Sequence, residues 1–280
     1  MKPFERANVD IAWCPGCGNF GILKLIREVL DELKADGRST VVVSGIGQAA
    51  KTPYYIDVNM FGVLHGRAVP VATAVKAANP ELVVVAEGGD GDMYGEGGNH
   101  FLHAVRRNVN IVHIVHNNMV YGLTKGQASP TSQKGFETKV QVDGVGNEPF
   151  NPISVALALR ASFVSRINIG NPEHAKTVLK AAFLHPGYAL VDIFQPCVTF
   201  NKINTYAWFT ENTYELDARH DTADLNAAMA RALESMPLPL GIFYRQEGST
   251  FEARVRHGER RPLYMNTHDA ARIQELFDAF

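Results

Sequence analysis

The sequence predicts an α/β fold in which a parallel β-sheet carries helices on both faces. Short runs rich in Val and Ile alternate along the chain with longer segments whose apolar residues recur at helical spacing. Several of the short runs end in glycine, aspartate or asparagine, which are poor strand formers and therefore mark strand ends. Strands that are separated by helices connect through crossovers, and crossovers of this kind build parallel sheets.

The predicted helices begin with residues 20–34, where Ile22, Ile26 and Val29 fall on one face. Residues 68–80 form the next predicted helix, which the proline at its end stops. The other predicted helices share the same apolar spacing and cover residues 97–108, 153–161, 172–185, 222–235 and 268–279.

The predicted strands are short and almost continuously apolar, as expected where helices cover both faces of a sheet. They cover residues 39–45, 81–89, 110–118, 162–167 and 188–196, with a further candidate at 240–245. The alternation weakens beyond Cys197. We therefore expect a main domain over residues 1–200 and a C-terminal extension over 201–280, packed on the same domain or on a partner subunit.

Composition excludes several classes of function. The chain has 280 residues, of which 46% are hydrophobic, so it can bury an ordinary globular core. A formal charge of -2 gives no basic field for nucleic acid. No apolar run resembles a signal peptide or approaches the roughly 20 residues of a membrane span. From the charge and the hydropathy we expect a protein that binds neither nucleic acid nor membrane. Because three cysteines cannot build a disulfide framework, we also expect it to be cytoplasmic.

Two polar segments follow neighbouring strands of the predicted sheet. They are "EGGDGDMYGEGGNH" at 87–100 and "HNNMVYGL" at 116–123. Glycines allow the backbone to approach a phosphate closely, whereas Asp90 would repel a phosphate unless a cation lay between them. Mg²⁺ fits that place, with Asn118 supplying a neutral oxygen. In this interpretation the loop from Tyr121 to Gly126 closes over the phosphates, with Thr124 and Lys125 as candidate contacts. Gly122 and Leu123 of the same loop are also candidate cofactor-binding residues.

Each motif has a plainer explanation when it is considered alone. A Gly-Asp-Gly sequence is most often a turn, and paired asparagines often end a strand. The spacing makes the pair more specific, because 25 residues separate Gly91 from Asn117. That length fits one crossover, so both loops would lie side by side at the ligand-binding edge of the sheet.

Taken together, these motifs resemble the diphosphate-binding motif of thiamine diphosphate (TPP) enzymes. With "CPGCG", "SGIG", "LHGRAVPVATAVK", "NNMVYGLTKGQASPTS" and "GIFY", the chain is similar to the β subunit of 2-oxoacid:ferredoxin oxidoreductases of the two-subunit, 2-oxoglutarate type. The resemblance extends from about residue 10 to about residue 245 and implies a TPP-binding fold with a diphosphate-type domain.

The resemblance assigns roles to individual residues. It implies that Asp90, Asn118 and the Val120 carbonyl bind Mg²⁺. The residues that it implies as lining or shaping the cofactor site are Gly45, Ile46, Gly47, Gly66, Gly89, Gly91 and Asp92. It also implies that Lys51, His65, Arg67 and Lys125 are catalytic candidates, the three cations among them lying around an anionic substrate or coenzyme A (CoA).

The three cysteines leave several interpretations open. Cys14 and Cys17 form a CxxC motif, and Cys197 follows a predicted strand. A CxxC motif can be a redox dithiol, part of a zinc site, or part of an iron–sulfur cluster whose ligands lie far apart in sequence. The resemblance implies one [4Fe–4S] cluster with a further cysteine in an "SGIGC" motif. Here "SGIGQAAK" places Gln48 at that position. The fourth iron would then have Gln48, another side chain or water as its ligand. Alternatively, the cluster would have three irons or be lost.

The histidines have a simpler interpretation. His100 and His103 share a predicted helix, and His113 and His116 alternate on a predicted strand. We expect them to face solvent or a subunit interface rather than to bind a metal.

The leading hypothesis is the β subunit of a 2-oxoacid:ferredoxin oxidoreductase that converts a 2-oxo acid, with 2-oxoglutarate preferred, and CoA to an acyl-CoA and CO₂ while reducing ferredoxin. The chain is too short to include the pyrimidine-binding domain of a TPP enzyme, so we expect an α subunit to supply it, in a dimer of αβ heterodimers. One rival is a non-oxidative TPP-dependent decarboxylase subunit. The other is a structural subunit with a degenerate site.

Overall fold

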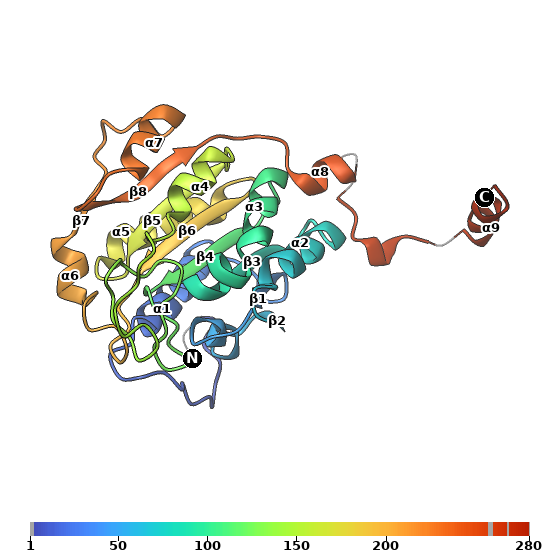
Figure 1. The fold of residues 1–280 in the computed structure, drawn as a ribbon. Helices are drawn as coiled ribbons and strands as arrows, with labels where there is room; N and C mark the ends of the chain where they lie inside the picture. The colour runs from blue at the N-terminus through green and yellow to red at the C-terminus, as the bar shows by residue number, and fades with distance from the viewer. Residues whose placement is uncertain (1–2, 257–259, 268, 280) are drawn as a thin grey trace.

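An eight-stranded sheet organises the chain in the computed structural model, which describes residues 3–256, 260–267 and 269–279 (Figure 1). The strand order across the sheet is β2-β1-β3-β4-β6-β5-β8-β7. The strands are β1 (Thr40–Ser44), β2 (Asn59–Gly62), β3 (Val83–Gly89), β4 (Val112–Asn117), β5 (Phe163–Asn168), β6 (Ala189–Phe194), β7 (Thr213–Glu215) and β8 (Leu238–Arg245).

The six strands from β2 to β5 in this order pair in parallel, which confirms the predicted parallel sheet. The other edge differs, because β8 runs antiparallel to β5 and pairs in parallel with the short β7. The register of β8 shifts between Val164 and Ser165 of β5. The segment beyond residue 200 therefore extends the same sheet.

Helices cover both faces of the sheet, as predicted, because alternate strand residues point to opposite sides. On one face Val41 and Val43 pack with α2 (Ala68–Ala78), α3 (Gly98–Arg107), α4 (Pro152–Ala158) and α7 (Leu225–Ala232). On the other face Val42 packs with α1 (Asn19–Glu32) and α5 (Pro172–Leu184).

Local sequence signals start and stop these helices. The side chains of Asn151 and Asn171 accept backbone N–H bonds at the starts of α4 and α5, and a proline follows each asparagine at the first helical position. The α3 helix ends at Arg107 with Asn108 in the left-handed conformation, so Arg106 and Arg107 lie where positive charge favours the helix dipole.

Several short elements complete the fold. They are 3₁₀ helices at Ala49–Tyr54 and Leu263–Met265, one stretch of π-helix at Gly91–Glu96, α6 (Tyr206–Glu211), α8 (Phe251–Val255) and α9 (Ala270–Asp278). The sequence did not predict β2, β7 or α6. The β2 strand is only four residues long and mostly exposed, so it lacks the apolar run by which strands were recognised.

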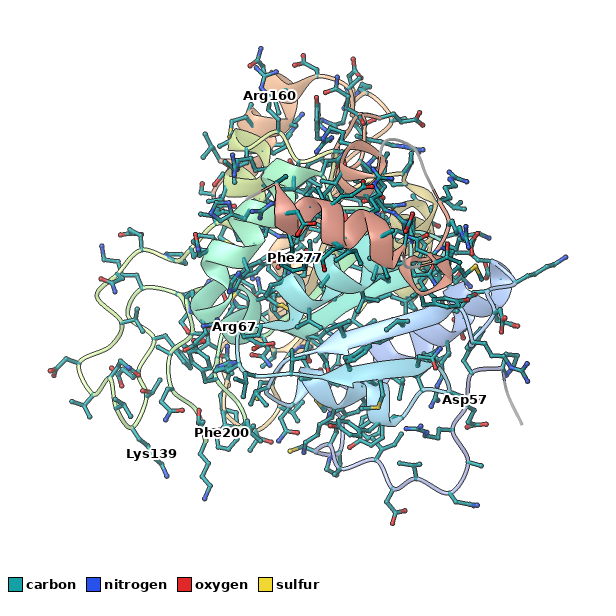
Figure 2. All side chains as sticks on the ribbon, turned by 90° about the vertical axis from the view of Figure 1, so that its right-hand side faces the viewer. Asp57, Arg67, Lys139, Arg160, Phe200 and Phe277 are labelled. Atoms are coloured by element: carbon teal, nitrogen blue, oxygen red, sulfur yellow. The ribbon has the colours of Figure 1, made fainter. Side chains whose placement is uncertain are left out.

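The predicted helix at 268–279 corresponds to α9, and residue 268 lies outside the described residues. In Figure 1, α9 stands clear of the sheet and its covering helices. Ile273, Leu276 and Phe277 on this helix are exposed, and Figure 2 shows Phe277 on the side that faces the viewer. Within the described residues, no helix combines the length and the apolar character needed to cross a bilayer.

The prediction for His113 and His116 was wrong, because both side chains are fully buried within β4. The His113 Nδ1 atom lies 2.6 Å from the Tyr188 hydroxyl, and burial lowers the pKa of His113 to about 3. His116 lies between Glu87 and Asn19, at 2.8 and 2.9 Å. Polar partners on neighbouring segments allow these residues to occupy core positions, which their spacing alone did not reveal.

The core assignment gives a direct test. Leu190 in β6 is fully buried, so Leu190→Ala should lower the free energy of unfolding by about 2–5 kcal/mol through lost burial and an unfilled cavity. Leu233→Ala is the matched control, because Leu233 is 67% exposed and should change stability by no more than about 0.5 kcal/mol. Urea unfolding of the two variants measures the difference. Equal effects would contradict this packing.

Candidate active site

A pocket opens at the carboxyl ends of β1, β3, β4 and β6, where ligands bind in parallel sheets of this kind. It is partly open to solvent, and the empty space within it, open solvent included, is about 890 Å³. The loops that follow these four strands supply most of its lining. The strand order therefore brings together segments that are far apart in sequence.

Three glycines make room for neighbouring groups at this edge. A Cβ atom at Gly45 or Gly88 would overlap the carboxylate of Asp92, and a Cβ atom at Gly91 would overlap the ring of Tyr121. Only glycine allows the backbone to approach so closely. The glycine-rich sequence is therefore required by packing within the chain as well as by any ligand.

Asp92 fixes the position of the segment that carries His65. One carboxylate oxygen accepts hydrogen bonds from His65 Nδ1 and from the backbone N–H of Gly66, both at 2.6 Å. Gly66 has a φ of +72°, which favours glycine. Burial raises the pKa of Asp92 above its usual value. On the outer side, His65 Nε2 lies 3.1 Å from Glu96, so two carboxylates orient the ring.

Asp90 is a buried carboxylate whose two side-chain partners are neutral hydroxyls. Ser129 and Thr131 donate to its Oδ2 atom at 2.5 and 2.6 Å. Asp90 lies between β3 and the π-helical stretch, an element that is rare and often found at functional sites. Burial raises the pKa of Asp90 to about 6, because the two hydroxyls offset only part of the cost of removing the charge from water.

A hydrogen-bonded chain connects Asp90 to the interior of the sheet. The Thr131 hydroxyl also lies 2.9 Å from Asn117 Oδ1, and the Asn117 amide donates to Asp192 at 3.0 Å. Asp192 forms a buried ion pair with Arg166 at 2.8 Å. Because each of these side chains has a polar partner, the hydrogen-bonded series fixes the position of Asp90 relative to the end of β4.

The residues after β4 form a compact loop beside Asp90. The backbone N–H of Val120 donates to Asn118 Oδ1 at 3.1 Å, which holds the amide in a local turn. Tyr121 and Gln127 pair through an isolated antiparallel bridge that closes the loop between them. The Tyr121 hydroxyl lies 3.3 Å from the carbonyl of Gly91 and 3.1 Å from Glu96, so the two predicted ligand-binding loops are in contact.

All three cysteines line the same pocket, and none is in a disulfide. The Cys-Pro-Gly-Cys segment forms a turn in which the Cys17 N–H donates to the Cys14 carbonyl at 3.0 Å and Gly16 has a φ of +79°, as a type II turn requires. Burial, with smaller contributions from Cys197 and Cys14, raises the pKa of Cys17 to about 11.

Most of the predicted site residues line this pocket: Cys14, Cys17, Ile46, Gly47, His65, Gly89, Asp90, Gly91, Asp92, Asn118, Val120, Gly122, Leu123, Thr124 and Cys197. The others, Gly45, Lys51, Gly66, Arg67 and Lys125, are not among its described lining residues. Gly45 instead leaves room for the Asp92 carboxylate, and the backbone N–H of Gly66 donates a hydrogen bond to it. Arg67 and Lys125 are exposed, and Lys51 lies on the 3₁₀ helix that follows β1.

Sequence reasoning gave no role to Ser129, Thr131 or Glu96, and it placed Tyr121 only at the start of the loop over the phosphates. The first two lie in "ASPTS", more than 30 residues after Asp90, and no spacing rule connects them to it. Their hydroxyls could have been suspected only from the need of a buried carboxylate for hydrogen-bond donors.

Comparisons with known proteins agree with this geometry. Residues 36–193 match the family model "Thiamine pyrophosphate enzyme, C-terminal TPP binding domain", and residues 197–259 match the model for the C-terminal part of the pyruvate ferredoxin oxidoreductase β subunit. A 2-oxoacid:ferredoxin oxidoreductase subunit beta from Saccharolobus solfataricus is 42% identical over 279 residues, 94% of this chain and 91% of that one.

The chain belongs to the family of 2-oxoacid:ferredoxin oxidoreductase β subunits. A "2-oxoglutarate oxidoreductase subunit KorB" from Mycobacterium tuberculosis is 45% identical over 192 residues, 69% of this chain and 52% of that one. A solved structure of 2-oxoglutarate:ferredoxin oxidoreductase from Magnetococcus marinus with 2-oxoglutarate, coenzyme A and succinyl-CoA bound has a TM-score of 0.91 and 37% identity, covering 99% of this chain and 96% of that one. The predicted TPP-binding fold and family are thereby confirmed.

The residues of this β subunit fit a magnesium diphosphate. Asp90 is a buried carboxylate without a positive partner among its hydrogen bonds, and a divalent cation would offset the cost of its burial. Carboxylate, amide and carbonyl oxygens are the ligands that Mg²⁺ prefers, and Asp90, Asn118 and Val120 of the pocket lining carry them.

The cysteines of the β subunit also fit an iron–sulfur cluster. Within residues 3–256, 260–267 and 269–279, no three His, Cys, Asp or Glu side chains converge as ligands of a single metal ion. A cluster has no need of such convergence, because each thiolate binds a different iron. Cationic irons would also favour the thiolate form of Cys17, whose burial otherwise favours the thiol.

The glycine at position 45 of the β subunit provides a steric test. Gly45→Ala should displace the Asp92 carboxylate and destabilise the chain by about 1–3 kcal/mol. Gly98→Ala is the matched control, because Gly98 lies at the start of α3 with open space around it, and alanine favours a helix. Thermal unfolding compares the two variants, and a Gly45→Ala protein as stable as the control would exclude this crowding.

Proposed function

We propose that this chain, with an α subunit, catalyses the reversible CoA-dependent oxidative decarboxylation of a 2-oxo acid and passes the electrons through an iron–sulfur cluster to ferredoxin. The observation that carries the proposal is that one pocket is lined both by the Asp90–Asn118 loops and by three cysteines. A diphosphate cofactor and an electron acceptor in the same pocket suit an oxidative reaction, because electrons released at one can pass directly to the other.

In this proposal the chain holds TPP through its diphosphate. Asp90, Asn118 and the Val120 carbonyl would bind Mg²⁺, and the glycines of both loops would bring backbone N–H groups to the phosphate oxygens. Gly45, Ile46, Gly47, Gly66, Gly89, Gly91, Asp92, Gly122, Leu123 and Thr124 would shape this site. TPP, when bound, supplies the carbon nucleophile that the reaction requires.

The catalytic candidates differ in how they are held. His65 lines the pocket and is oriented by Asp92 and Glu96, so it is suited to position or exchange a proton beside the cofactor. Arg67 and Lys125 are exposed cations. Arg67 lies two residues after His65, and Lys125 follows Thr124. We propose that they and Lys51 attract the anionic 2-oxo acid or CoA.

Cys14, Cys17 and Cys197 would hold the cluster of the β subunit. A Cβ atom added to Gly122 would lie 3.8 Å from the Cys197 sulfur, so the loop after β4 runs close to one of the thiols. This proximity supports a short path between cofactor and cluster.

We propose that the α subunit supplies the pyrimidine-binding domain, which completes the TPP site. The complete enzyme would be a dimer of αβ heterodimers. We propose that residues 201–280 form the extension beyond the main domain and that its terminal part binds that subunit, because Leu263, Tyr264, Leu276 and Phe277 are exposed. For the substrate we propose 2-oxoglutarate, with succinyl-CoA as product. Support comes from the high similarity to the Magnetococcus marinus enzyme, whose structure holds both molecules.

The deciding experiment uses the β subunit purified anaerobically with its α subunit. We expect TPP, magnesium, iron and sulfide in the complex, and CoA-dependent viologen reduction that is fastest with 2-oxoglutarate. A complex that releases CO₂ from the 2-oxo acid without iron or viologen reduction would instead identify the non-oxidative decarboxylase. The β subunit alone should be inactive.

Asp90→Ala tests whether the site is catalytic or only structural. The variant complex should lose bound TPP and at least about 100-fold of its activity, because Asp90 is the only charged group among the three proposed protein ligands of Mg²⁺. Asp143→Ala is the control, since Asp143 is exposed on the polar loop and is not part of the described pocket lining. A variant with unchanged activity would identify a degenerate site.

Thr131→Val tests how Asp90 is held. Removal of a hydroxyl that orients a metal ligand should weaken Mg²⁺ binding about 10- to 100-fold, with a smaller effect on kcat at saturating Mg²⁺. Thr131→Ser retains the hydroxyl and should restore most of the affinity. Magnesium titration of TPP binding measures both variants, and equal affinities for Val and Ser would show that the hydroxyl does not position Asp90.

A further inference from the structure

Gln48 lies in the same pocket as the three cysteines. It lies between β1 and the 3₁₀ helix at Ala49–Tyr54, and its backbone carbonyl accepts a hydrogen bond from the Trp13 indole N–H at 2.8 Å. Trp13 precedes Cys14 in the sequence and also lines the pocket. This bond therefore ties the segment of Gln48 to the segment that carries the CxxC motif.

The side-chain oxygen of Gln48 is buried and has no hydrogen-bond partner within the described part of the chain. A buried amide oxygen without a partner costs about 1–3 kcal/mol, so proteins seldom retain one without a reason. Of the described pocket-lining residues, only Gln48 and Asp92 carry such an atom, and the other oxygen of Asp92 is held by His65 and Gly66. The Gln48 oxygen is thus an unpartnered electron-pair donor on a residue that lines the pocket of the three thiols.

A four-iron cluster needs a ligand at each iron, and three cysteines serve three of them. We propose that the Gln48 side-chain oxygen binds the fourth iron, so that the cluster has three thiolate ligands and one neutral oxygen ligand. This inference rests on the proposed function, which places a cluster among Cys14, Cys17 and Cys197. Binding through the amide oxygen releases no proton and would satisfy the otherwise unpartnered atom.

The chemistry of the ligand set has two consequences. An amide oxygen is a harder and weaker ligand for iron than a thiolate, so the fourth iron should be lost more readily than in a cluster with four cysteines. Replacement of a thiolate by a neutral ligand also makes the cluster less negative by one unit, which should raise its reduction potential.

The test compares the anaerobically purified native αβ complex with its Gln48→Ala and Gln48→Cys variants. Gln246→Ala is the control, because Gln246 is an exposed glutamine that is not part of the described pocket lining. Iron loss during mild ferricyanide oxidation is followed by the electron paramagnetic resonance signal of the three-iron form. In parallel, the reduced cluster is exchanged into ¹⁷O-labelled water and examined for ¹⁷O hyperfine coupling. Both readouts are independent of turnover.

We expect the native complex to retain four irons and to show no ¹⁷O coupling. Gln48→Ala should lose the fourth iron at least about tenfold faster and gain ¹⁷O coupling as water replaces the amide, a change equivalent to about 1.4 kcal/mol. Gln48→Cys should retain the iron longer than the native complex, and Gln246→Ala should match it.

Three results would overturn the inference. Coupling to ¹⁷O in the native complex would identify water as the ligand, and identical iron loss in the native and Gln48→Ala complexes would show that Gln48 does not bind iron. A purified cluster that has only three irons even under anaerobic conditions would have the same consequence. A complex that binds TPP but contains no iron would overturn the cluster of the proposed function itself, and the metal analysis of the same sample separates that case.

Discussion

The site depends on a buried carboxylate at the carboxyl end of a parallel strand. Asp90 is 1% exposed, and its side chain is held by two hydroxyl groups that carry no charge. Burial of an ionised group is costly unless an opposite charge accompanies it. Nearby, the chain meets this requirement for Asp192 by pairing it with Arg166. For Asp90 it provides hydrogen bonds and an open pocket instead, which is what a site for a bound cation requires.

The remaining features of the pocket follow from that constraint. The backbone must come close to a cation that lies between a carboxylate and a diphosphate. Glycines permit this close approach, and both loops contain them. The loop after β4 must be held against the loop after β3, and Tyr121 spans the two. Because β6 lies next to β4 in the sheet, its end delivers Cys197 to the same edge. The sheet order therefore brings the candidate diphosphate-binding loops and the three cysteines to one pocket.

Much of this organisation could be predicted from the sequence. The main strands and helices were recognised because apolar runs and helical spacing are local properties, and the parallel order followed from their alternation. The edge strands β2 and β7 were missed, since short and exposed strands have no apolar signature. The burial of His116 was missed as well, because its partners Glu87 and Asn19 come from other elements.

Within the site, residues next to a motif could be predicted, whereas residues that support the motif from a distance could not. Asp90 and Asn118 follow strand ends, and their spacing matches one crossover. Thr131 contacts Asp90 only because a long polar loop folds back over the sheet edge, a tertiary property that no local pattern encodes. The significance of Gln48 likewise required a structure, since only the fold shows that this residue lines the pocket of the three cysteines and that its buried side-chain oxygen has no partner in the described part of the chain.

The most direct test of this account is an anomalous-scattering map of the αβ complex prepared with Mn²⁺ in place of Mg²⁺ and with TPP. The account predicts one manganese peak at bonding distance from the Asp90 carboxylate, the Asn118 amide oxygen and two phosphate oxygens. A map in which TPP is bound while the metal lies away from Asp90 and Asn118 would contradict it.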